Sequence, residues 1–398
     1  MLDIGEKEIG AAARVIRSKQ LFRYGERKRG QLSECLKFER SLATAMGAEH
    51  ALVVTSGTAA LTCGLAGLGI GPGDEVIIPA YTFMASALAP LSLGVIPVLA
   101  EVDDSLTVDP EDVAAKITPR TKAIMPVHMC GFPADMNAIM KLARRHSIPV
   151  LEDACQADGG SYRGKRLGAI GNAGAYSFNY YKNMTSGEGG AVVTSDKVCY
   201  ERALIFHDGG CVFRPHSHEL GVPFFAGSNF RMNEILAAIL RVQLRRLDGM
   251  LARTRARKRA LLTALDGHPR LRAIRSNDIE GDCGTTVGLR FRSEAQTRAF
   301  IAGLRERGIS ASTPIDSDRH VYCNWEPVME KRGSYHPGLD AFKRPENADS
   351  CCEYQPDMCP RTLEFLRTTV FLPITLQQTM RQIRRIASSC REMGDALA

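Results

Sequence analysis

The alternation of short apolar runs with amphipathic segments between residues 51 and 190 constrains the fold more than any other feature of the chain. The apolar runs have the length of strands and are bounded by Gly, Pro or Asp: 51–55, 76–79, 95–100, 123–127 and 150–152. The segments between them have helical periodicity: 58–68, 83–93, 110–116 and 136–146. Apolar strands that alternate with helices predict an α/β fold, with a mostly parallel sheet covered by helices on both faces.

The segments on either side of this alternation predict an arm and a second domain. Ahead of the sheet we expect helices at 6–18 and 33–46. After it we expect a strand at 191–194, a helix at 198–206, one long helix from about 233 to 265, strands at 286–291 and 370–373, helices at 295–307 and 377–393, and an irregular stretch at 317–359. The 398 residues therefore divide into an N-terminal helical arm (1–48), a large domain (49–248) and a smaller C-terminal α+β domain (249–398).

Composition excludes several classes of protein. The 51 Lys and Arg exceed the 44 Asp and Glu by 7, with no dense basic stripe, so we expect no nucleic-acid partner. No apolar stretch approaches the roughly 18 residues needed to span a membrane, and the first residues lack the apolar core of a signal peptide. The twelve Cys form no Cys-x-x-Cys pair, which is typical of a reducing compartment. We expect a soluble cytoplasmic protein without a membrane partner.

The glycines at positions 67, 69, 71 and 73 do not form a dinucleotide-binding loop. A complete G-x-G-x-x-G would need glycine at one of the positions held by Pro72 and Asp74. The glycines also end a predicted helix and lead into a strand, whereas a pyrophosphate binds at the start of a helix. We interpret them as a helix C-cap and a turn.

Three short segments at predicted strand ends carry the residue types of a cofactor site. Gly57 and Thr58 lie between a strand and a helix, so their amides can bind a phosphate, although an ordinary helix N-cap has the same pattern. Asp153 ends a strand and can pair with a protonated ring nitrogen, or else cap the next turn. Lys182 precedes a Gly-rich turn, where burial would free its amine for a Schiff base; an exposed loop lysine is the alternative. In a parallel sheet these segments meet at one edge.

A phosphate cradle, a ring-nitrogen partner and an imine-forming lysine follow one another in the order found in pyridoxal 5′-phosphate enzymes. The chain also resembles the DegT/DnrJ/EryC1/StrS aminotransferases in five segments: 56–61, 79–83, 152–157, 176–190 and 227–234. The resemblance implies the fold type I of pyridoxal 5′-phosphate-dependent transferases, which is aspartate aminotransferase-like, with a large, mostly parallel sheet domain and a smaller α+β domain. It also implies pyridoxal 5′-phosphate as the cofactor and aminotransferase activity.

The resemblance implies roles for individual residues. Lys182 binds the cofactor covalently and then moves a proton as general base and acid, and Asp153 pairs with the pyridine nitrogen. The other expected cofactor contacts are Gln156 near the phenolic oxygen, Gly57, Thr58 and Ser177 at the phosphate, and Phe83 stacked on the ring, with Tyr81 as second choice.

The expected oligomer also follows from the resemblance. Asn229, with Arg231 beside it, reaches the phosphate of the neighbouring subunit, so we expect a homodimer with shared active sites.

Substrate contacts are expected at less specific positions. His207 and His218 are candidates for contact with the substrate, and Arg202, Arg214 and Arg231 are candidate clamps for the donor carboxylate, with a solvated helix face as the alternative. The spacing of His207, Cys211, His216 and His218 fits no standard metal site, so we expect no metal. Selectivity for the acceptor is expected in the loops 209–228 and 317–360.

Departures from the family pattern narrow the activity. Many members have His where this chain has Asp158, so the role of that position is open. Because Lys182 is present, the dehydratase branch that replaces the lysine with His is disfavoured. The segments 119–129 and 226–248 resemble both the aminohydroxybenzoate-forming branch, which dehydrates its substrate and retains the lysine, and the L-glutamine-dependent scyllo-inosose aminotransferases. The C-terminal segments favour the second group.

We therefore predict an aminotransferase that moves an amino group from L-glutamine or L-glutamate to a keto-sugar or keto-cyclitol in antibiotic biosynthesis. A lysine-retaining dehydratase or lyase with the same cofactor is the alternative, and it would form product without an amino donor. A non-catalytic sensor or structural homodimer is a third hypothesis, and it would take up no cofactor.

Overall fold

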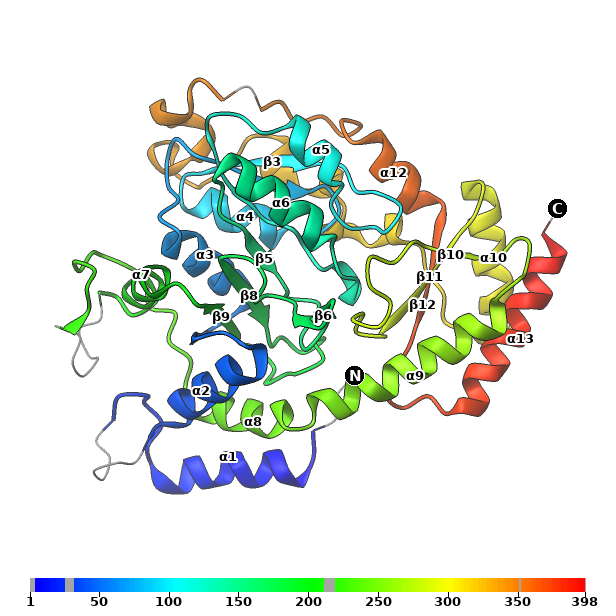
Figure 1. The fold of residues 1–398 in the computed structure, drawn as a ribbon, viewed down its shortest axis with the longest axis horizontal. Helices are drawn as coiled ribbons and strands as arrows, with labels where there is room; N and C mark the ends of the chain where they lie inside the picture. The colour runs from blue at the N-terminus through cyan, green and yellow to red at the C-terminus, as the bar shows by residue number, and fades with distance from the viewer. Residues whose placement is uncertain (1–3, 26–31, 211–218, 351, 398) are drawn as a thin grey trace.

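The computed structural model describes residues 4–25, 32–210, 219–350 and 352–397. The chain begins with an arm of two helices at the predicted positions, α1 (Glu6–Ser18) and α2 (Glu34–Met46). Ser33 caps α2 by accepting a hydrogen bond from the Leu36 amide at 3.0 Å. Both helices pack against α8 (Glu234–Leu244), along the lower edge of the molecule in Figure 1.

The central sheet is mostly parallel, as predicted. Its strand order is β1-β9-β8-β5, and the parallel bridges Ile124–Val150 and Val127–Asp153 continue it into β4-β2-β3. Within it, β9 alone runs antiparallel to its neighbours. The strands are β1 (His50–Val54), β2 (Glu75–Pro79), β3 (Ile96–Ala100), β4 (Thr121–Ile124), β5 (Leu151–Asp153), β8 (Ala173–Ser177) and β9 (Gly190–Thr194). The carboxyl ends of the parallel strands therefore share one edge.

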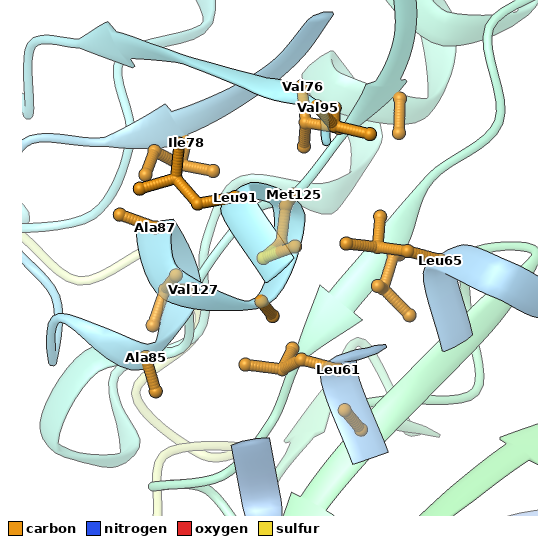
Figure 2. Close-up of a cluster of buried hydrophobic side chains, with 14 of the residues drawn as sticks. Leu61, Leu65, Val76, Ile78, Ala85, Ala87, Leu91, Val95, Met125 and Val127 are labelled. Carbon is orange, nitrogen blue, oxygen red and sulfur yellow. The ribbon is translucent and has the colours of Figure 1, made fainter. Parts of the chain in front are cut away.

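Helices cover both faces of this sheet, as the alternation predicts. They are α3 (Gly57–Gly67), α4 (Ala85–Ser92) and α7 (Lys197–His207) on one face, and α2, α5 (Pro110–Ala115), α6 (Met136–His146) and α8 on the other. Figure 2 shows part of the first interface, where Leu61 and Leu65 of α3 and Leu91 of α4 are buried with Met125. Removal of these apolar side chains from water holds α3 and α4 on the sheet and thereby fixes their N-termini at its edge.

A smaller domain follows, with its own hydrophobic core around Leu289, Phe300 and Val370. Its antiparallel sheet is β10 (Arg272–Ala273), β11 (Thr286–Arg290) and β12 (Thr369–Pro373), with α10 (Glu294–Glu306) and α13 (Met380–Ala396). The leucines of α12 (Pro360–Arg367) are instead buried in the core of the large domain. The remaining elements are the hairpin β6 (Ser161–Tyr162) and β7 (Lys165–Arg166), the short α11 (Glu326–Met329), and several 3₁₀ turns. Part of the stretch predicted to be irregular, including Tyr322 and Trp325, is buried in the core of the large domain.

The prediction of one helix from 233 to 265 is wrong, because the helix is broken at Arg245 and Arg246. The structure has α8 and then α9 (Leu247–Leu265). The two helices have different partners, since α8 packs on the arm while α9 runs to the small domain and packs on α13 (Figure 1). The predicted domain boundary at residue 248 falls at the start of α9. No helix among the described residues has the length and apolarity of a membrane span.

The turn predicted at the glycines 67–73 is confirmed. Helix α3 ends at Gly67 and β2 begins at Glu75. Gly69 and Gly73 have φ of +78° and +96°, a region in which a side chain would be strained, so glycine suits both positions.

Candidate active site

A cavity of about 660 Å³ lies at the carboxyl edge of the sheet. Its wall combines the carboxyl ends of β1, β2, β4, β5 and β8 and the segments that follow them with Thr285, Thr286 and His320 from the C-terminal third of the chain. Seven residues predicted to contact the cofactor line it: Gly57, Thr58, Phe83, Asp153, Gln156, Ser177 and Lys182. The structure therefore brings together residues that are up to 125 positions apart in the sequence.

The start of α3 forms one end of the cavity. Ser56 caps the helix by accepting a hydrogen bond from the Ala59 amide at 3.0 Å. The amides of Gly57 and Thr58 have no hydrogen-bond partner within the part of the chain that the structure describes. A Cβ on Gly57 would lie 2.7 Å from the Cβ of Ser177, so only glycine lets the Ser177 hydroxyl approach the helix start. Two free amides, a hydroxyl and the positive end of the helix dipole suit a phosphate.

Asp153 lies in the wall at the end of β5, with an exposed fraction of 4%. Its Oδ2 accepts a hydrogen bond from the Ser86 hydroxyl at 2.7 Å, and its Oδ1 accepts one from the Cys155 amide at 3.1 Å. The Ser86 hydroxyl is in turn 2.8 Å from that of Thr82. Asp153 therefore caps the following turn and also lines the cavity, so the two interpretations of this residue are compatible.

Glu152, the neighbour of Asp153, points to the opposite side of the strand and is fully buried. Its carboxylate accepts hydrogen bonds from three backbone amides, those of Gly168, Ile170 and Gly171, and lies 3.0 Å from Nε2 of His128. Nδ1 of His128 accepts a hydrogen bond from the Ala134 amide, so Nε2 is the protonated nitrogen of the ring and donates a hydrogen bond to Glu152. Glu152 is thus a structural residue, so of the two adjacent carboxylates Asp153 is the one available to a ligand.

Gln156 connects the cavity to the loop after β4. Its Oε1 accepts a hydrogen bond from the Cys130 amide at 3.1 Å. Cys130 has φ of +55°, which is uncommon for a residue with a side chain, and its carbonyl accepts a hydrogen bond from the Thr285 hydroxyl at 3.2 Å. Strained backbone that the surroundings hold in place is common at functional sites. The Nε2 group of Gln156 remains as its donor toward the cavity.

Lys182 lies in the turn after β8 and is half-buried. Its backbone amide donates to the Asn179 carbonyl at 3.0 Å, which fixes the turn. Among the described side chains, no carboxylate lies within ion-pair distance of its Nζ. The interpretation as an exposed loop lysine does not hold, because the side chain lines the cavity.

His320 and Asp158 line the cavity, but the sequence assigned neither of them a role in the site. The ring centroids of His320 and Phe83 lie 5.4 Å apart. The backbone carbonyl of His320 accepts a hydrogen bond from the Thr82 amide at 3.0 Å. Burial lowers the pKa of His320, and the charge on Lys182 lowers it further. His320 comes from a stretch without periodicity, so no local pattern could identify it. Asp158 stood out only as a departure from the family pattern.

Several predicted residues do not line the cavity. Tyr81 is buried beside it, and its backbone pairs with Val321. His207 is fully buried, with Nδ1 at 2.6 Å from the Leu204 carbonyl, so we no longer expect it to contact the substrate. Arg231 pairs with Asp208 at 2.8 Å, and Asn229 is exposed.

The remaining predicted side chains also fall outside the cavity wall. Arg202 lies against the turn at Gly69. Cys211, Arg214, His216 and His218 lie outside the described residues. Among the described residues, no three His, Cys, Asp or Glu side chains form a group that could hold a metal ion.

Comparison with protein-family models gives a match over most of the chain. Residues 2–322 match the model of the DegT/DnrJ/EryC1/StrS aminotransferase family. The 3-amino-5-hydroxybenzoate synthase of Amycolatopsis mediterranei is 39% identical over 78% of this chain and 80% of its own length.

Two further relatives are transaminases. The dTDP-3-amino-3,4,6-trideoxy-alpha-D-glucose transaminase of Streptomyces venezuelae is 44% identical over 58% of this chain and 60% of its own length. The L-glutamine:2-deoxy-scyllo-inosose aminotransferase of Streptomyces lividus is 41% identical over 60% of this chain and 57% of its own length. The chain thus matches somewhat less than two thirds of each of these two relatives.

Comparison with solved structures agrees with the family match. The crystal structure of a 3-amino-5-hydroxybenzoic acid synthase superposes with a TM-score of 0.79 and 32% identity, and the match covers 99% of this chain and 98% of that one.

Proposed function

Because this chain belongs to the DegT/DnrJ/EryC1/StrS aminotransferase family, whose members are pyridoxal 5′-phosphate-dependent, we propose that it transfers an amino group from L-glutamine or L-glutamate to a keto-sugar or keto-cyclitol. The observation that carries this proposal is the cavity in which Lys182, Asp153 and the free amides of Gly57 and Thr58 meet. A place in antibiotic biosynthesis and in the cytoplasm is part of the same proposal.

The residues of the cavity fit pyridoxal 5′-phosphate. The start of α3 and the Ser177 hydroxyl would hold the phosphate, Asp153 would pair with the ring nitrogen, and Lys182 would bind the aldehyde carbon. When bound, the cofactor supplies an electron sink for negative charge at the substrate carbon.

The side chains of this protein divide the remaining chemical work. Nζ of Lys182 takes a proton from the substrate carbon and returns it at a second carbon, as general base and then general acid. Asp153 would present its carboxylate to the ring nitrogen, because the Ser86 hydroxyl and the Cys155 amide hold its two oxygens in place. Phe83, at the mouth of the cavity and 45% exposed, would cover the ring and exclude water.

A polyhydroxylated ring as acceptor agrees with the character of the cavity wall. The volume of about 660 Å³ is within the usual range for small-molecule sites of roughly 300–1,000 Å³. Beyond the expected cofactor contacts, the wall includes polar side chains suited to hydrogen bonds with hydroxyl groups, among them Asn179, Tyr181, Asn183, Glu188, Thr286 and His320. The names of the sugar and cyclitol transaminase relatives support the same class of acceptor.

A homodimer with shared active sites is also part of the proposal. Asn229 is exposed, which leaves it available to a second subunit. Large apolar side chains are exposed on and after α1: Ile9, Ile16, Leu21 and Phe22. Several large apolar side chains exposed on one short stretch of chain favour an interface with another protein subunit.

The visible spectrum of the purified enzyme loaded with cofactor tests the proposal. We expect L-glutamine or L-glutamate to bleach the visible absorbance of the lysine-bound cofactor, and L-alanine to leave it. The Lys182→Ala variant should fold but lose turnover; an active variant would end the assignment. Product formed from a cyclic keto-acid without any amino donor would instead favour the dehydratase or lyase.

A further inference from the structure

The imidazole of His320 has one nitrogen bound to the protein and one left for a ligand. Its Nδ1 lies 3.1 Å from the Ser317 carbonyl oxygen. Because a carbonyl can only accept a hydrogen bond, Nδ1 carries the proton, and Nε2 is the unprotonated acceptor of the neutral ring. Nε2 has no hydrogen-bond partner in the part of the chain that the structure describes. The side chain lines the same cavity as Lys182, so this acceptor is available to a ligand there.

Backbone contacts hold His320 in place before any ligand arrives. Its own carbonyl accepts a hydrogen bond from the Thr82 amide at 3.0 Å, and the carbonyl of Arg319 accepts one from the Met84 amide at 3.0 Å. The ring also packs on Phe83, with the centroids 5.4 Å apart. The segment after β2 therefore fastens His320 to the carboxyl edge of the sheet. A hydrogen-bonding group that is fixed in advance loses little freedom when a ligand binds.

The charge of the ring limits the chemistry of its partner. Burial lowers the pKa of the His320 imidazole below its ordinary value, and the charge on Lys182 lowers it further. The Ser317 carbonyl and Asp318 oppose this fall without cancelling it, so the ring is uncharged at pH 7. An uncharged ring whose free nitrogen is an acceptor offers no hydrogen to a carboxylate or a phosphate. A hydroxyl group, in contrast, can donate a hydrogen bond to it.

We propose that Nε2 of His320 accepts a hydrogen bond from a hydroxyl group of the acceptor ketone, and that this contact selects hydroxylated ketones. The inference rests on the proposed function and deepens it, because it assigns recognition of the acceptor to one atom. His320 then acts in the half-reaction that consumes the ketone and not in the one that consumes the amino donor. The side-chain amide of L-glutamine is the competing partner for Nε2, and the two half-reactions distinguish these partners.

One fixed acceptor is enough to give strong selectivity. A site built to bind a hydroxyl group rejects an analogue that lacks it, because the partner atom in the site is then left unpaired. Nε2 of His320 would be such an atom, since its ring cannot turn away without losing the hydrogen bond of Nδ1 to the Ser317 carbonyl.

Single-turnover spectra of the cofactor-loaded enzyme separate the two half-reactions. The amino donor bleaches the visible absorbance, and a ketone added to the bleached, donor-free enzyme restores it. The probes are scyllo-inosose, a cyclitol ketone, and dTDP-4-keto-6-deoxy-D-glucose, a keto-sugar. In His320→Phe, which keeps a flat ring against Phe83 but has no acceptor, we expect the ketone that the wild type uses to restore the absorbance about 10- to 100-fold more slowly. The rate of bleaching by the donor should change by less than about threefold.

His320→Gln is the matched variant, because the side-chain oxygen of glutamine can accept a hydrogen bond near the position of Nε2 but is not a base. It should regain most of the restoration rate that His320→Phe loses. His336→Phe is the control for loss of an imidazole, since His336 is exposed and lies outside the cavity. This control should have wild-type rates in both half-reactions.

The outcomes that contradict the proposal differ from those that contradict the aminotransferase assignment. An unchanged restoration rate in His320→Phe would overturn the proposal, and slower bleaching would place the contact of Nε2 on the amino donor instead. Equal losses in the Phe and Gln variants would show that hydrogen-bond acceptance is not what the ring supplies. Restoration of the wild type by neither ketone would show that the site does not select hydroxylated ketones. A wild-type enzyme that no amino donor bleaches would instead end the aminotransferase assignment.

Discussion

At the scale of single residues, the site depends on which polar atoms are paired within the protein and which are left for a ligand. Asp153 and Glu152 are adjacent, yet Glu152 is satisfied by backbone amides while Asp153 lines the cavity. The sequence predicted Asp153 as the carboxylate of the site, and the alternation of side chains along the strand directs its neighbour Glu152 to the other face. It could not identify the donors, since Ser86 lies 67 positions away from Asp153.

Ser86 holds Asp153 in place, and its removal should affect turnover more than substrate binding. In Ser86→Ala, Oδ2 of Asp153 loses its 2.7 Å hydrogen bond and the carboxylate can rotate. A small misplacement in an active site costs up to about 100-fold in rate. We expect kcat to fall by about 10- to 100-fold while KM for the donor stays within about twofold. Steady-state kinetics measure both.

Ser92→Ala provides the matched control for this prediction. Ser92 is in the same helix, α4, and its hydroxyl donates to the Ala89 carbonyl at 2.7 Å, outside the cavity. The control variant should have wild-type kinetics. Indistinguishable kcat values for the two variants would show that Ser86 does not position Asp153.

At the scale of secondary structure, the sequence predicted a helix or strand well where the whole element packs against the same neighbours. The expected helices at 6–18 and 136–146 have the predicted bounds, because their apolar faces repeat at helical spacing. The break between α8 and α9 was missed, because Arg245 and Arg246 carry no Gly or Pro signal. The break follows from packing of the two helices on different partners, which local sequence does not encode.

One side chain of β5, Glu152, holds the loop before β8 in place through its hydrogen bonds to the loop amides. The two carboxylate oxygens of Glu152 now accept four hydrogen bonds, two each. In Glu152→Gln an NH₂ group would replace one oxygen, so two buried N–H donors would lose their acceptor. Each unsatisfied buried group costs about 1–3 kcal/mol. We expect the free energy of unfolding in urea to fall by about 2–5 kcal/mol. Hydrogen exchange at Gly168, Ile170 and Gly171 should accelerate in parallel.

The exposed Glu364 offers a control for the loss of a carboxylate. It pairs with Arg290 at 3.1 Å and its side chain is 70% exposed, so Glu364→Gln should change stability by less than about 1 kcal/mol. If Glu152→Gln were no more harmful than this control, β5 would not hold the loop through its carboxylate.

At the scale of the whole molecule, the cavity lies where the two domains meet. Residues around 320 complete its wall and are buried in the core of the large domain, so the C-terminal third of the chain belongs to both cores. Sequence patterns predicted two domains, but the placement of an aperiodic segment against a distant sheet is a tertiary property. The Cys283 amide donates to the Gly131 carbonyl at 3.1 Å, which ties the small domain to the wall beside Cys130.

A buried ion pair supports this junction. Lys258 of α9 lies 2.7 Å from Oδ2 of Asp282, the two side chains are 8% and 1% exposed, and Nζ lies 4.7 Å from the ring centroid of Phe132 in the large domain. Burial raises the pKa of Asp282, and Lys258 opposes that rise. Removal of one partner from a buried pair costs about 3–5 kcal/mol, so Lys258→Met should destabilise the protein by about that amount at pH 8.

The loss of stability in Lys258→Met should depend on pH, and the pKa of Asp282 determines in which direction. A carboxyl whose folded pKa lies above its unfolded pKa contributes most to stability at low pH, and that contribution is lost as the pH rises through the folded pKa. Lys258→Met raises the folded pKa of Asp282 further, so the variant should be closest to the wild type near pH 5 and lose stability toward pH 8. Lys258→Met combined with Asp282→Asn should recover much of the loss, whereas Lys331→Met, at an exposed pair with Glu353, should have little effect. A deficit that is equal at both pH values would mean that Lys258 stabilises the junction by packing on Phe132 rather than by its charge.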